Sequence, residues 1–177
     1  MNYFHQESDR LKFRKLTKND ILSWVEFFDK NDRLHFLGMD LSKDKKELAS
    51  EWINAQLIRY KKQEFGHLAV EIKDTNEFIG MGGILTRTLN NKKEYEIAYS
   101  LKPKYWGKGY GTEIAKQINK FGEKHIDTDR LISIIDTRNT PSAHVAIKNG
   151  MEILFKTNYL GMEVNVYGNY IDSRNNL

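Results

Sequence analysis

Three glycines spaced two residues apart are the part of this sequence most suited to binding chemistry: Gly107, Gly109 and Gly111. Because glycine lacks a Cβ and takes positive φ readily, such a loop can turn several backbone N–H groups toward one point. An alternating, strand-like run from Glu94 to Leu101 precedes the loop, and a helical pattern follows it. The start of a helix adds free N–H donors and the positive end of its dipole. The pattern predicts a phosphate or pyrophosphate site, unless the glycines serve only to turn a tight corner.

Two common glycine-rich nucleotide motifs do not fit this loop. In the P-loop pattern, the Gly-Lys pair is followed by Ser or Thr, whereas Gly109 follows Lys108 here and the earlier glycine is missing at the required distance. The dinucleotide pattern requires glycine at the sixth position, where this chain has Thr112. The loop also comes too late in the chain to leave room for a doubly wound sheet.

The elements that must position the loop can be read from hydrophobic periodicity. Upstream of it, strands are predicted at 10–16, 66–73, 78–85 and 94–101, with helices near 21–28 and 44–62. Three glycines fall inside the third of these strands, which indicates a bulge or a close approach by another element. They are Gly80, Gly82 and Gly83.

Downstream of the loop and its helix, the chain is predicted to form a buried strand, a short helix and a closing hairpin. The apolar run 131–135 is typical of a strand with a parallel neighbour, reached by a right-handed crossover. Pro141 favours a helix start and Gly150 a helix end. The segments 151–159 and 162–170 then alternate as an antiparallel pair.

Composition bounds the class of protein. The chain has 177 residues, enough for one domain with a sizeable core, and 40% hydrophobic with 29% charged residues is typical of a globular protein. It has no cysteine, which fits a reducing compartment, and a formal net charge of only +4 makes nucleic acid an unlikely partner. Because no signal peptide or membrane span is recognisable, we expect a cytoplasmic protein that does not enter a membrane.

At this point the chain resembles the GCN5-related N-acetyltransferase (GNAT) superfamily, specifically its ribosomal-protein-alanine acetyltransferase-like branch. The superfamily loop [QR]-x-x-G-x-[GA] is matched at Gly109 and Gly111, with Trp106 in place of Gln or Arg. Further similarity, in chain order, lies in the opening strand, two inner strands and the segment after the buried strand. These matches are Arg10–Thr17 with Asp20, Ile79-Gly80, Glu96–Tyr99, and Asn139–Ser142 continuing to Met151.

The resemblance implies an α/β (α+β) GNAT fold. Its mixed, mostly antiparallel sheet would have about seven strands, with strands 4 and 5 splayed apart, and about four helices. Residues 9–170 would form a single N-acetyltransferase domain between flexible ends at 1–8 and 171–177. The implied co-substrate is acetyl-CoA, held by Tyr99, Ser100, Leu101, Trp106, Gly107, Lys108, Gly109, Tyr110, Gly111, Thr112 and Asn139. Lys102 and Lys104, with Lys108, could neutralise phosphate charge or be ordinary surface lysines.

Acetyl transfer to an amine needs a base, because alkyl amines are mostly protonated near neutral pH. Glu96 is the candidate, and the alternative for it is a structural or surface carboxylate. The tyrosine that acts as the acid in many superfamily members falls at Ala146 here and is therefore absent. The branch suggests Ser142 instead, which could equally be an ordinary residue of the first helical turn. Tyr167 is a third candidate.

The predicted function is therefore direct transfer of an acetyl group from acetyl-CoA to a primary amine, on a protein N-terminus or a small molecule. The alternative is an acyl-CoA-binding module without efficient turnover. No metal is predicted, because the five histidines show no ligand spacing. The acceptor stays open among protein N-termini, polyamines, aminoglycosides and amino-acid analogues, and the protein could be a monomer or a homodimer.

Overall fold

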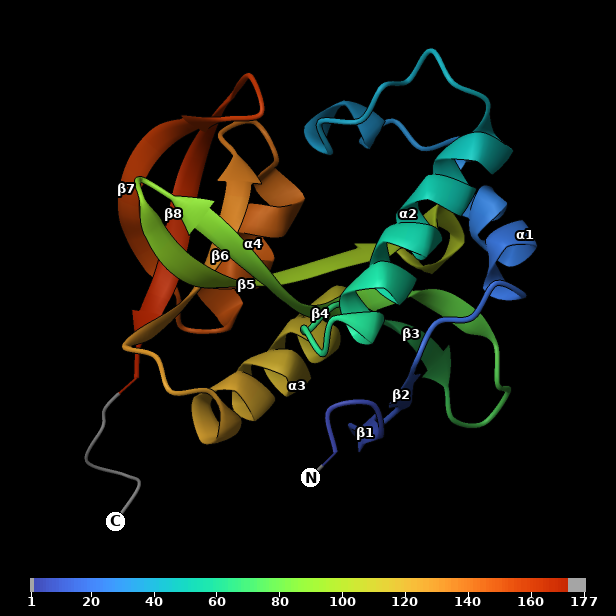
Figure 1. Ribbon diagram of the computed structural model, residues 1–177, viewed down its shortest axis with the longest axis horizontal. Coiled ribbons are helices and arrows are strands. Elements are labelled where there is room, and N and C mark those ends of the chain that lie inside the picture. Colours follow the sequence, from blue (N-terminus) through green and yellow to red (C-terminus); the bar gives the residue numbers. More distant parts are fainter. Residues whose placement is uncertain (1, 172–177) are drawn as a thin grey trace.

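A computed structural model describes residues 2–171 of the chain (Figure 1). These residues form four α-helices and eight strands. In chain order they are β1 (Gln6–Glu7), β2 (Leu11–Arg14), α1 (Asp20–Trp24), α2 (Lys45–Lys61), β3 (His67–Ile72), β4 (Phe78–Leu89), β5 (Lys92–Leu101), α3 (Tyr110–His125), β6 (Arg130–Asp136), α4 (Thr140–Lys148), β7 (Glu152–Tyr159) and β8 (Met162–Tyr170). Short 3₁₀ turns lie at Val25–Phe28, Leu34–Phe36 and Pro103–Tyr105. Within the described residues, no helix has the length and apolar character needed to cross a membrane.

All eight strands form one sheet in the order β1-β2-β3-β4-β5-β6-β8-β7. Every neighbouring pair is antiparallel except β5 and β6, which are parallel and meet at a single residue pair, Glu96 and Ile132. The remainder of β5, from Ile97 to Leu101, therefore diverges from β6. This confirms the predicted fold and splay, with eight strands rather than about seven. The strands predicted as 4 and 5 are β5 and β6, because β1 precedes them.

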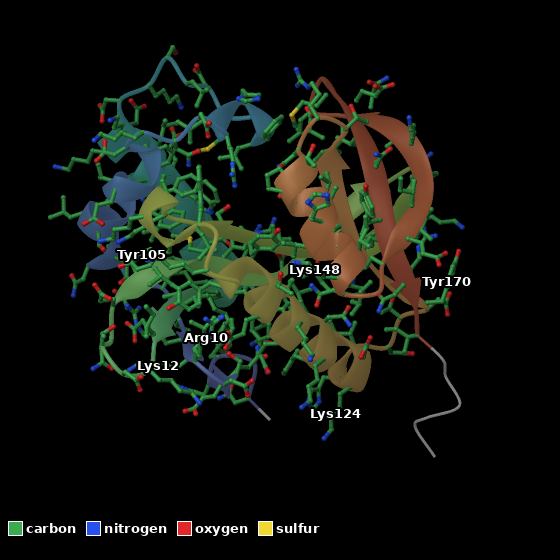
Figure 2. The ribbon with its side chains drawn as sticks, turned by 180° about the vertical axis from the view of Figure 1, so that it is seen from behind. Arg10, Lys12, Tyr105, Lys124, Lys148 and Tyr170 are labelled. Atoms are coloured by element: carbon green, nitrogen blue, oxygen red, sulfur yellow. The ribbon has the colours of Figure 1, made fainter. Side chains whose placement is uncertain are left out.

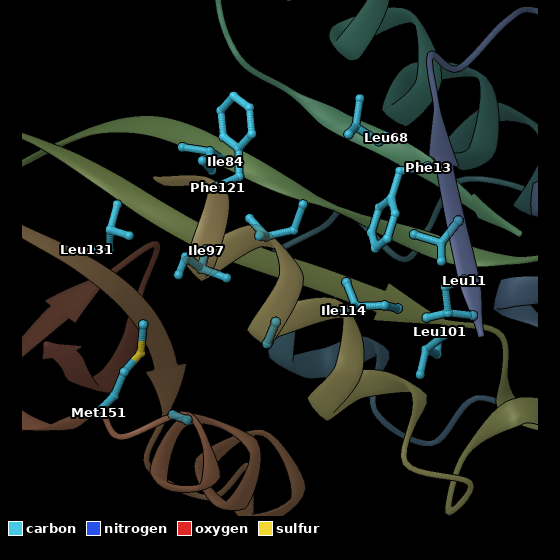
Figure 3. Close-up of a cluster of buried hydrophobic side chains, with 14 of the residues drawn as sticks. Leu11, Phe13, Leu68, Ile84, Ile97, Leu101, Ile114, Phe121, Leu131 and Met151 are labelled. Carbon is cyan, nitrogen blue, oxygen red and sulfur yellow. The ribbon is translucent and has the colours of Figure 1, made fainter. Parts of the chain in front are cut away.

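The sheet is covered on both faces, and each face has its own core. On one face α3 and α4 pack through Ile114, Ile118 and Ala146, which join a large buried cluster with strand residues such as Ile84 and Ile97 (Figure 3). On the other face α1 and α2 pack around Trp24, Phe27, Leu48 and Ile53, against Ala69 and Met81 of the sheet. Because strand side chains alternate between faces, Ile97 and Glu96 of β5 point to opposite sides.

The glycines of β4 are explained by close approaches, as the sequence indicated. A Cβ on Gly82 would lie 2.3 Å from Ile114 Cγ2, so glycine lets α3 lie directly on the strand. A Cβ on Gly83 would lie 2.3 Å from the Gly66 carbonyl oxygen, and one on Gly80 would lie 2.4 Å from the Ser100 carbonyl oxygen. A side chain at any of the three positions would have to displace the backbone or a core residue.

The N-terminus corrects one prediction. Residues 1–8 were expected to be a flexible end, and residue 1 lies outside the described residues. Tyr3, however, is buried, and its hydroxyl links the residue before β3 to β4: it donates to the Gly66 carbonyl at 2.5 Å and accepts from Ile84 N at 2.8 Å. Gln6 and Glu7 add a strand to the sheet edge. At the other end Ile171 N donates to the Asp129 carbonyl at 2.9 Å, and the rest of the predicted flexible end, 172–177, lies outside the described residues.

Candidate active site

A cleft of about 470 Å³ lies where β5 and β6 diverge. It is lined from both faces of the sheet: Glu96 projects from the α2 face, whereas Tyr99 lies against α3 and Ser142 lies in the first turn of α4. The gap between the strands therefore joins the two faces. The cleft brings together Glu96, Tyr99, Ser100, Asn139 and Ser142 of the predicted site, together with Ala146, and the glycine loop lies outside its lining.

The glycine loop takes the positive-φ backbone conformations that its glycines allow. Gly107 and Gly109 take positive φ, +74° and +80°, and Gly109 is the N-cap of α3. The first hydrogen bond of the helix runs from Glu113 N to the Gly109 carbonyl at 3.1 Å. The N–H groups of residues 110–112 come before it and have no acceptor within the helix, so they can bind a ligand. A Cβ on Gly111 would lie 3.1 Å from Tyr99 Cε2, so glycine brings the start of α3 against β5.

The N-terminal segment holds this loop in place. Arg10 donates from Nη1 to the Lys108 carbonyl at 3.1 Å and from Nε to the Glu113 carboxylate at 2.7 Å. Its guanidinium lies 4.4 Å from the centre of the Tyr110 ring, and the Ser8 hydroxyl also donates to Glu113 at 2.7 Å. Arg10 is labelled in Figure 2, beside the first turns of α3. The loop is therefore fixed by polar contacts from a segment that lies 98 to 105 residues earlier in the chain.

Trp106, the departure from the superfamily loop pattern, contacts protein groups on both sides. Its Nε1 donates to the Leu101 carbonyl at 2.8 Å, and the Arg33 guanidinium lies 3.8 Å from the centre of its ring. The indole thus ties the loop to the end of β5 and to the segment between α1 and α2. The cofactor contacts predicted for Trp106 and Leu101 stay predictions.

Lys102, predicted to neutralise phosphate charge or to be an ordinary surface lysine, does neither of these in the structure. Its side chain is buried and donates to the Ser23 hydroxyl at 2.8 Å and to Glu26 at 3.3 Å, so it is turned into the protein. Lys104 also contacts Glu26, at 3.4 Å, although its side chain is exposed. Lys108 is exposed on the loop itself.

Glu96 is a buried carboxylate in the cleft, paired with Arg87 of the adjacent strand. Arg87 Nε donates to Glu96 Oε2 at 2.7 Å. Burial raises the pKa of Glu96 above its ordinary value, and the positive charge and hydrogen bond of Arg87 work against that shift. A carboxylate with a raised pKa is a stronger base than an exposed one.

The first turn of α4 places Ser142 beside Tyr99. Asn139 caps this helix, its Oδ1 accepting from Ser142 N at 3.3 Å, so the Ser142 hydroxyl is not the capping group. Burial raises the pKa of Tyr99 to about 12, with the Ser142 side chain working in the opposite direction, so the phenol stays protonated at neutral pH. Tyr167 belongs to the buried core cluster and is not among the residues that line the cleft.

Sequence reasoning missed several polar residues of the cleft, among them Arg87, His67 and Arg59. The His67 backbone N–H donates to Gln56 Oε1 at 2.9 Å, and Trp52 Nε1 donates to His67 Nδ1 at 3.1 Å. Burial, followed by the charges of Arg87 and Arg59, lowers the pKa of His67 to about 3, so the ring is neutral. The sequence held only a weak signal for them, namely polar residues at positions expected to face inward on a strand and on the facing helix.

The sequence matches the family model of the acetyltransferase (GNAT) domain over residues 10–152. The chain belongs to this family. It is also 30% identical, over 146 residues, to the uncharacterized protein YkkB of Bacillus subtilis (strain 168), covering 81% of this chain and 83% of that protein. The match confirms the predicted superfamily, the acetyltransferase class of enzyme and acetyl-CoA as the co-substrate.

Solved structures share the fold at lower identity. An acetyltransferase from Agrobacterium tumefaciens str. C58 has a TM-score of 0.75 at 22% identity, covering 96% of this chain and 95% of that one. The ribosomal L7/L12 alpha-N-protein acetyltransferase RimL, in complex with coenzyme A, has a TM-score of 0.74 at 18% identity, covering 94% and 97%. The ribosomal-protein-S5-alanine acetyltransferase of Vibrio fischeri has a TM-score of 0.72 at 17% identity, covering 96% and 97%. Structures of the predicted branch are thus among those with this fold.

Proposed function

We propose that this protein transfers the acetyl group of acetyl-CoA directly to a primary amine bound in the cleft. The observation that carries the proposal is the position of Glu96. This buried carboxylate lies at the one point where β5 still pairs with β6, and it lines the same cleft as the Tyr99 and Ser142 side chains on the other face. The cleft would therefore offer a carboxylate base and two hydroxyl groups to one bound amine and thioester.

The residues present fit acetyl-CoA. The N–H groups of residues 110–112 would bind the pyrophosphate at the positive end of α3. The backbone of β5 from Tyr99 to Leu101, which β6 leaves unpaired, would hydrogen-bond the pantetheine as an added strand does, and Asn139 would line its end. When bound, acetyl-CoA supplies an acetyl thioester that an amine can attack without a covalent enzyme intermediate.

Glu96 would accept the proton that the acceptor ammonium must lose before it can attack. Its raised pKa brings the carboxylate closer to the working pH, where a general base is most effective. Arg87 holds the carboxylate in one orientation and favours its ionised form. A backbone N–H of β5 would stabilise the negative charge that develops on the carbonyl oxygen.

Ser142 would return a proton to the departing thiolate. The Tyr99 phenol beside it stays protonated at neutral pH and can donate to the serine hydroxyl as that proton leaves. Ala146 lines the same cleft without any group that can donate a proton. The pair of hydroxyls therefore takes the place of the tyrosine found in many members of the superfamily.

Two measurements test the proposal. Millimolar acetyl-CoA should raise the melting temperature of the purified protein, since a ligand that binds only the folded state must stabilise it. Release of free thiol, followed with a panel of N-terminal peptides, polyamines and amino acids, should then reveal turnover. The second candidate function is an acyl-CoA-binding module without efficient turnover, because Ala146 stands where many members of the superfamily have the acid tyrosine. Stabilisation by acetyl-CoA without turnover of any amine would favour that module.

A further inference from the structure

We propose that the acceptor part of the cleft, on the α2 face of the sheet, is built for a small amine that carries an anionic group on an apolar body, such as an apolar amino acid. The inference rests on the proposed N-acetyltransferase function and names the class of its acceptor. Three features carry it: a surplus of hydrogen-bond donors on the cleft floor, acidic neighbours that already have cationic partners, and an apolar roof.

The surplus begins with two arginines. A guanidinium offers five N–H donors. Arg87 uses Nε for Glu96, and the hydrogen bonds found among residues 2–171 include none from its terminal nitrogens. Arg59, on the facing helix α2, makes one long contact from Nη1 to Glu64 at 3.4 Å. Both side chains line the cleft and are half-buried, so several N–H donors face a space of limited hydration.

His67 adds a neutral donor to the same floor. Because its Nδ1 accepts the hydrogen bond of Trp52, the ring proton of the neutral imidazole must be on Nε2. Nε2 is buried and has no hydrogen-bond partner among the described residues. His67 lines the cleft and is only 5% exposed. A buried donor without a partner is unusual in a folded protein and marks a position that a ligand oxygen can complete.

The acidic residues of the cleft do not accept hydrogen bonds from these free donors. Glu51 lies 2.5 Å from Lys43 Nζ, and Asp136 lies 2.8 Å from Arg138 Nη2. Glu96 engages Arg87 through one nitrogen. The donors that remain would be matched by a group that only accepts hydrogen bonds, and a carboxylate is the partner that the planar guanidinium fits best.

The roof of the cleft is apolar. Phe36, Leu37 and Met39, from the segment between α1 and α2, face Leu160 and Met162 of the β7–β8 hairpin across the cleft. The two sides approach closely, since a Cβ on Gly38 would lie 3.1 Å from Leu160 Cδ1. Polyamines and aminoglycosides would bring several positive charges onto two arginines beneath an apolar roof. An apolar amino acid would satisfy both surfaces.

The test compares phenylalanine with phenylalaninamide, which has the same body and no carboxylate, as acceptors at saturating acetyl-CoA. We expect kcat/KM to be about 10- to 100-fold higher for the acid, the range of one or two charged hydrogen bonds. The amide has the more easily deprotonated amine, so amine reactivity alone would give the opposite order. In Arg59→Gln the preference should shrink at least severalfold. It should persist in Lys61→Gln, which removes the same charge from an exposed position on the same helix.

A binding measurement makes the test independent of turnover. Phenylacetate should raise the melting temperature of the protein more than phenylacetamide does, and Arg59→Gln should reduce that difference. Equal effects of the two compounds, or equal kcat/KM for acid and amide, would overturn the anionic site and leave the N-acetyltransferase intact. Absence of any stabilisation by acetyl-CoA would instead overturn the proposed function, while the phenylacetate comparison would still decide the anionic site.

Discussion

Arg87 of β4 and Glu96 of β5 form a diagonal ion pair across the two antiparallel strands, with Arg87 Nε 2.7 Å from Glu96 Oε2, and both line the cleft. Burial favours the protonated form of the carboxyl, and the guanidinium favours the ionised form. The proton affinity of the proposed base is therefore set by two opposed effects, and removing one of them has a predictable sign.

Replacing Arg87 by methionine should raise the pKa of Glu96 further, because the effect that lowers it is lost while burial remains. A base must be ionised to act, so the acidic limb of the kcat/KM profile should move to higher pH. The profile is measured with one amine in both proteins. In the control Arg130→Met, which removes the partner of Glu94 outside the cleft, the limb should stay in place. A limb that does not move in Arg87→Met would contradict the assignment of Glu96 as the base.

Glu96→Gln should lower kcat/KM by about 10²- to 10⁴-fold, the usual contribution of a general base. The amide oxygen can still accept the Arg87 hydrogen bond, so the dissociation constant of acetyl-CoA should change by less than about threefold. Glu94→Gln is the matched control, since Glu94 is a buried carboxylate two residues away whose partner, Arg130, lies outside the cleft. Similar activities in the two variants would identify Glu96 as a structural ion-pair partner.

Ser142→Ala should lower kcat by about 10²-fold while the KM for acetyl-CoA stays nearly constant, because the hydroxyl acts on the leaving thiolate rather than in binding. The helix should not be weakened, since Asn139 caps it through the backbone N–H of residue 142. Circular dichroism and steady-state kinetics separate the two effects. Wild-type kcat in Ser142→Ala, combined with a large loss in Tyr99→Phe, would move the role of the acid to the phenol.

Gly109→Ala should weaken acetyl-CoA binding by about tenfold or more, because φ of +80° costs an L-residue about 1–2 kcal/mol and the loop would relax away from the phosphate geometry. Gly161→Ala is the control: its φ is +76° in the β7–β8 turn, and an added Cβ would meet no atom within 4 Å. Both variants should lose similar unfolding free energy in urea, and calorimetry should show weaker acetyl-CoA binding in Gly109→Ala alone. Equal binding in the two variants would show that the loop conformation does not matter for the cofactor.

The features that could be predicted from the sequence are those that short-range patterns define. Alternation from Glu94 to Leu101 placed a strand, Pro141 and Gly150 bounded a helix, and the spaced glycines marked the loop that the structure builds at the start of α3. The acceptor floor was not predictable in this way. Arg59 and His67 lie on different elements and meet in the tertiary structure, and neither belongs to a motif with its own spacing.

The N-terminal segment escaped prediction for the same reason. A two-residue strand has too few positions to show alternation, and nothing in the sequence around Tyr3 indicates that its hydroxyl joins Gly66 to Ile84. Its contribution comes from groups 63 and 81 residues away along the chain. The stability of the protein should therefore depend on a residue that resembles part of a loose end.

Tyr3→Phe should lower the free energy of unfolding by about 2 kcal/mol, because the change leaves the Ile84 N–H and the Gly66 carbonyl without a buried partner. Urea denaturation measures this as a lower midpoint with an unchanged m-value. Tyr170→Phe removes the same hydroxyl from a side chain that is 70% exposed, and it should change the free energy by less than about 0.5 kcal/mol. If the two variants were equally stable, the N-terminal segment would not belong to the cooperative fold. A selective loss in Tyr3→Phe would show that the folded domain begins before residue 9.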